Sequence, residues 1–112
     1  MAIPIRFPLA CVALALAAAA CGSTSAQTLT FNIHVTGTKS NLGDISAREG
    51  DTIQMTVTCD KDEEIHLHGF DYKFSCKPSH PASRTFAADR TGVFEYEIES
   101  SSTHLGNVTI NP

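Results

Sequence analysis

A chain of 112 residues, 42% of them apolar, is long enough for one domain with a modest core and too short for two. Its 12 acidic and 8 basic residues give a net charge of −4, and no basic cluster with interleaved aromatic residues occurs. This acidic balance argues against nucleic acid and anionic lipid as partners.

The first 21 residues are typical of a secretory signal peptide: Arg6 precedes an Ala- and Leu-rich run over residues 9–20 that is short for a bilayer span. The run ends in Ala-Cys21-Gly, which resembles the lipobox of bacterial lipoproteins and implies lipidation of Cys21. Cleavage after Ala26 is the alternative. We therefore predict an exported domain over residues 28–112 on a polar tether of residues 22–27, in the periplasm or cell envelope and anchored by lipid.

From residue 28 onward, apolar and polar residues alternate with a period of two, which indicates β-strands. In chain order the strands are expected at about 29–35, 44–48, 53–59, 64–68, 72–76, 84–87, 94–98 and 107–110, with turn signals between them. Seven or eight short strands without helix periodicity predict an all-β, antiparallel β-sandwich.

Two cysteines, Cys59 and Cys76, remain in the exported domain. Cysteine pairs in an oxidising compartment usually form disulfides, so we predict this one. The alternative is a soft-metal site, since Cys76 and His80 have a Cys-x3-His spacing.

Alternation within the strand at 64–68 places His66 and His68 on one face and Ile65 and Leu67 on the other. The two histidines are about 6 to 7 Å apart at their bases, which allows both rings to bind one transition-metal ion. A solvated histidine pair is the alternative interpretation.

The segments Glu64-Ile65-His66-Leu67-His68-Gly69 and 86–97 resemble those of small exported cupredoxin-like domains, and the resemblance extends over residues 28–112. It implies a Greek-key sandwich in which His66 takes the place of the first copper ligand. The other cupredoxin ligands come from the loop between the last two strands, which in blue-copper members carries Cys, His and usually Met. Here residues 99–105 contain His104 but neither Cys nor Met.

The resemblance therefore implies a non-blue site formed by His66, His68 and His104 with Glu99, or with Glu97 in its place. Such nitrogen and oxygen ligands suit Cu(II), with Zn(II) as the second choice. We expect Glu95, Glu97 and Glu99 to form a row of solvated carboxylates, except for the one that binds the metal.

Two functions follow from these observations. The first is binding of copper or a similar divalent ion for storage, delivery or buffering. The second is a metal-free interaction or accessory module for another envelope protein. We expect no enzyme activity, no nucleic acid partner, and contact with a membrane only through the lipid anchor.

Overall fold

The computed structural model describes residues 25–112, so the predicted signal peptide and the lipidation site at Cys21 lie outside the described residues. Nine strands form in chain order: β1 (Thr28–Thr36), β2 (Lys39–Ser40), β3 (Ile45–Arg48), β4 (Thr52–Cys59), β5 (Glu63–Leu67), β6 (Tyr72–Cys76), β7 (Ala82–Ala87), β8 (Gly92–Ile98) and β9 (Thr103–Asn111). Residues 25–112 contain no helix with the length and apolarity that a membrane span requires.

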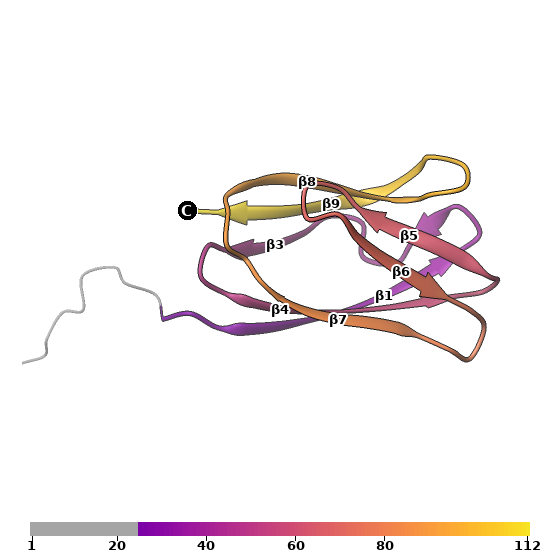
Figure 1. The fold of residues 1–112 in the computed structure, drawn as a ribbon, viewed down its shortest axis with the longest axis horizontal. Coiled ribbons are helices and arrows are strands. Elements are labelled where there is room, and N and C mark those ends of the chain that lie inside the picture. The colour runs from indigo at the N-terminus through magenta and orange to yellow at the C-terminus, as the bar shows by residue number, and fades with distance from the viewer. Residues whose placement is uncertain (1–24) are drawn as a thin grey trace, which may run out of the picture.

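The strands form two sheets that pack face to face, with the order β2-β1-β4-β7 in one and β3-β9-β8-β5-β6 in the other. Figure 1 shows the two layers, with β1, β4 and β7 in the lower one and β5, β8 and β9 in the upper one. The predicted all-β sandwich is therefore confirmed.

The sheets are mixed, whereas the sequence predicted antiparallel pairing throughout. The pairs β1–β4 and β3–β9 run parallel, and the remaining pairs within the sheets run antiparallel. Alternation reveals which face of a strand is buried but not the direction of its neighbour, because both pairings have a side-chain period of two. One strand more than predicted is present, because the two-residue strand β2 was not expected from the sequence.

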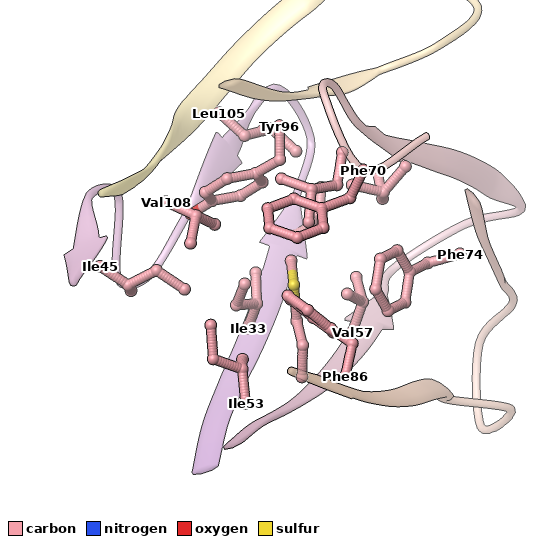
Figure 2. Packing of buried hydrophobic residues seen from close by; sticks show 14 of the residues in the cluster. Ile33, Ile45, Ile53, Val57, Phe70, Phe74, Phe86, Tyr96, Leu105 and Val108 are labelled. Carbon is pink, nitrogen blue, oxygen red and sulfur yellow. The ribbon is translucent and has the colours of Figure 1, made fainter. Parts of the chain in front are cut away.

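The core lies between the inner faces of the two sheets, where the predicted alternation is realised. Figure 2 shows Tyr96 and Val108 of one sheet facing the layer of Ile33, Ile53 and Val57 from the other. Met55 is fully buried in this core, as expected of a side chain on the inner face of β4.

A disulfide between Cys59 and Cys76 joins β4 of one sheet to β6 of the other, with the two Cα atoms 5.7 Å apart. The predicted pairing is thus confirmed. The alternative site with His80 is ruled out, since the sulfur of Cys76 is already bonded.

A buried carboxylate, Asp51, closes the turn between β3 and β4. Its two oxygens accept hydrogen bonds from the backbone N–H groups of Gln27 and Arg48, each at 2.9 Å. These two bonds lower the pKa of Asp51 below its ordinary value, because they favour the ionised form. The start of the folded chain is therefore fixed to the turn by one side chain.

Candidate metal centre

Three strands of the larger sheet bring the histidines and carboxylates together on its outer face. Cross-strand pairing sets His66 on β5 opposite Glu97 on β8, and Glu97 is in turn opposite His104 on β9. His68 directly follows β5, and its backbone N–H donates to the carbonyl of Glu95 at 2.9 Å. Residues far apart in sequence therefore meet because their strands are neighbours.

The predicted pair His66 and His68 does share one face, with ring centroids 4.4 Å apart. Together with Glu97 these residues form a compact set, here called the inner group, in which one ligand atom from each residue lies within 4.8 Å of the others. The side chains of His66 and Glu97 are only 14% and 13% exposed, while that of His68 is half-exposed.

Each histidine of this face has a carboxylate within hydrogen-bonding distance. His66 Nε2–H donates to Asp71 at 2.7 Å, and His68 Nε2–H donates to Glu97 at 2.6 Å. The hydrogen bond to Glu97 raises the pKa of His68 above its ordinary value, and the charges of other nearby glutamates raise it further. The bond from His66 lowers the pKa of Asp71, because it stabilises the carboxylate form.

The inner group has Glu97 where the sequence favoured Glu99. Glu99 lies just past the end of β8, and its Oε2 atom is 3.3 Å from Nδ1 of His66. It is thus adjacent to the inner group without belonging to it. Strand register decides between the two glutamates, because only Glu97 is directly opposite His66.

His104 was predicted in a loop, and that prediction is wrong: it lies in β9, which begins at Thr103. The connection from β8 is a tight turn in which Ser102 adopts a positive φ of 52°, so the strand resumes earlier than the polar sequence suggests. His104 donates from Nδ1 to Glu95 at 2.6 Å and stands beside the inner group.

Two further residues of the cluster, Glu95 and Asp71, were not predicted as part of a site. Glu95 was assigned to a solvated row, although its spacing of two from Glu97 does place it on the same face. Asp71 has no such signal in the sequence. It lies in the turn before β6 with a positive φ of 55°, a conformation that alternation does not reveal.

The inner group fits a transition-metal ion in both distance and chemistry. Two ligands bound to one ion at about 2.0 to 2.2 Å lie at most about 4.4 Å apart, so atoms spread over 4.8 Å need only small side-chain movements. Two imidazoles and a carboxylate suit Cu(II) or Zn(II). In addition, Nδ1 of His66 is buried and makes no hydrogen bond, although Oε2 of Glu99 lies 3.3 Å away, so the lone pair of this nitrogen is available to an ion.

Neither a family model nor a curated protein sequence matches this chain. Its fold does match solved structures. A copper binding protein in its apo form aligns with a TM-score of 0.63 at 10% identity, over 80% of this chain and 93% of the other. A chain of a heme-copper terminal oxidase dimer aligns with a TM-score of 0.61 at 13% identity, over 73% of this chain and 64% of the other.

A multi-copper oxidase from Pseudomonas thermotolerans also aligns, with a TM-score of 0.61 at 16% identity, over 78% of this chain and 30% of the oxidase. This chain therefore spans less than two thirds of the terminal-oxidase chain and under one third of the multi-copper oxidase. At such low identity the likeness concerns the fold, and it confirms the predicted cupredoxin-like sandwich.

Proposed function

We propose that this chain is an exported cupredoxin-like domain that binds Cu(II), or a similar divalent ion, through His66, His68 and Glu97. Its role would be metal storage, delivery or buffering, which makes it a binding domain and not an enzyme. The signal-like segment and the lipobox-like Cys21 support a place in the periplasm or cell envelope on a lipid anchor.

The observation that carries the proposal is the compactness of the inner group on a rigid sheet. Both histidines and the glutamate are placed by neighbouring strands, so little side-chain entropy is lost when an ion binds. Asp71 accepts a hydrogen bond from one ring nitrogen of His66, and a carboxylate in that position orients a metal-binding histidine.

A non-blue centre is the form of copper site that these residues support. Blue centres need a thiolate, but both cysteines of the described domain are in the disulfide, and Met55 is buried in the core. The solved structures with this fold include a copper binding protein and two oxidases, which makes copper the first ion to test.

One observation favours the second function, a metal-free interaction module. Every histidine of the cluster already has a carboxylate partner at 2.6 to 2.7 Å, so the cluster can persist as a network of hydrogen bonds without an ion. Such a network would present a rigid, charged surface to another envelope protein.

Calorimetric titration with Cu(II) and Zn(II) separates the two functions. The chain without its first 21 residues should bind one equivalent of Cu(II) with submicromolar affinity and show weak, non-blue absorption at saturation. Intense blue absorption would contradict the non-blue site. If neither ion gave saturable binding, the metal proposal would fail and the interaction module would stand.

A further inference from the structure

Beside the inner group lies a second pair of side chains of the types that bind metals, Glu95 and His104, here called the outer pair. Its two side chains are 42% and 52% exposed, in contrast to the largely buried His66 and Glu97. The side chains that could bind a metal are thus more exposed to solvent near His104 than near His66.

A β-bulge aims His104 at this face. Tyr96 of β8 is opposite Gly106, but the next residue, Glu97, is opposite His104, so β9 contains one extra residue at this point. Without that residue Glu97 would face Leu105, and His104 would take part in a different row. Bulges often redirect a side chain next to a functional site.

The position of the bulge is fixed by close packing around Gly106. A Cβ atom there would clash with the backbone carbonyl of Gly43 and would lie 2.8 Å from the hydroxyl oxygen of Tyr96. Only glycine fits, so the bulge cannot easily move along β9. His104 is therefore held in place by the packing beneath it.

Glu95 connects the outer pair to the inner group because its two carboxylate oxygens face different histidines. Oε2 accepts the hydrogen bond from His104, while Oε1 lies 3.8 Å from Nε2 of His68. A carboxylate in this position can hold an ion on one oxygen while the other contacts the next ligand. His68 would then be the first inner ligand that an incoming ion meets.

The charge of the face favours a cation at both places. Four carboxylates gather here, those of Glu95, Glu97, Glu99 and Asp71; their ion pairs are with histidines, and one lysine, Lys73, lies opposite His66 on β6. One divalent ion would neutralise only half of their formal charge. A surface that stays negative draws cations toward it and raises the rate of encounter.

We infer that Glu95 and His104 form an outer, low-affinity cation site through which a divalent ion reaches and leaves the inner group. The inference rests on the proposed function. Two protein ligands hold an ion more weakly than three, so the outer pair is occupied briefly during loading and release. An ion that moves through it exchanges its ligands one at a time, and this lowers the barrier for exchange.

A residue that only lowers a barrier speeds capture and release by the same factor and leaves the equilibrium affinity unchanged. The substitution His104→Ala should therefore slow both the capture and the release of Cu(II) about tenfold while the dissociation constant stays the same. Glu95→Gln, which keeps the shape but removes a negative charge close to the inner group, should slow the capture of Cu(II).

The test uses the chain without its first 21 residues, loaded with one equivalent of Cu(II). Release is followed by stopped-flow absorbance after mixing with excess coloured chelator, and the affinity is measured by calorimetry. His34→Ala is the matched control, since His34 is an exposed histidine on β1 of the other sheet. It should behave like the unaltered protein.

Two results would overturn the inference while sparing the proposed function. One is unchanged release from the His104→Ala protein. The other is a large loss of affinity in that protein, which would make His104 a ligand of the inner group itself. If the unaltered protein bound no ion, the proposed function would fail first and the inference with it.

Discussion

The sandwich has two outer faces built on the same strand geometry, and they carry different chemistry. On the smaller sheet, hydroxyl and amide pairs accompany a single histidine, His34: Thr30 donates to Gln54 at 3.0 Å, and Thr56 and Ser83 share a hydrogen bond of 2.8 Å. On the larger sheet the equivalent positions hold histidines and carboxylates. Cross-strand pairs stabilise both faces, but among the described residues only the second brings together three side chains of metal-binding types within reach of one ion.

This contrast teaches that the fold requires polar residues on its outer faces without specifying which ones. Hydroxyl and amide pairs meet that need on one sheet. The concentration of ionisable groups on the other sheet therefore calls for a functional explanation, and four changes test the contrast.

The largest effect on stability should come from removing the disulfide that joins the two sheets. Replacing Cys59 and Cys76 together by alanine should lower the free energy of unfolding by about 2 to 4 kcal/mol, because the bond closes a loop with a sequence separation of 17. Urea unfolding measures this loss. Copper affinity should stay largely intact, since both faces keep their residues, and a loss of affinity without a loss of stability would assign the cysteines to the metal.

Removing one imidazole from each face tests the comparison directly. His66→Ala or His68→Ala should weaken Cu(II) binding at least about a hundredfold, or about 2.7 kcal/mol, whereas His34→Ala should leave it unchanged. Calorimetry on the three proteins provides the measurement. Equal affinities would show that the clustered histidines are no more than a solvated surface.

A change beneath the charged face should separate stability from binding. The buried hydroxyl of Tyr96 bonds to the carbonyl of Gly43 and lies 3.0 Å from Ser40 Oγ. Tyr96→Phe should lower the free energy of unfolding by about 1 to 2 kcal/mol, because it leaves a partner unsatisfied. Thermal unfolding with and without Cu(II) checks this, and a matching loss of affinity would show that the face depends on this bond.

The smallest effect should be a pH dependence specific to the charged face. The pKa of His68 is raised in the folded protein, so its pair with Glu97 stabilises the fold fully below about pH 6.5. This contribution is lost as the pH rises through the raised pKa. In the presence of a chelator, the difference in melting temperature between the unaltered protein and Glu97→Gln should be larger at pH 6 than at pH 9. An equal difference at both values would contradict the assignment.

Much of this could be predicted from local pattern. A period of two placed His66 and His68 on one face and their apolar neighbours in the core. The expected export to an oxidising compartment predicted the disulfide. These inferences need only the geometry of one strand or the chemistry of one compartment.

The remaining features depend on contacts between distant segments. The choice of Glu97 over Glu99 follows from the register of β5 and β8, and the place of His104 follows from a bulge with glycine packing beneath it. A one-residue shift of register exchanges the two faces of a strand, so such details could not be derived from alternation alone.

The parallel pairing of β3 with β9 has a consequence for how the chain acquires its structure. Ile45 lies opposite Val108, and β9 separates β3 from β8 in the larger sheet, so β3 cannot join this sheet until β9 is available. Contacts of such long range slow folding, because the loop must close before any of them forms. For the export proposed above, slow folding would be an advantage, because a chain that folds late can cross a membrane while it is still unfolded.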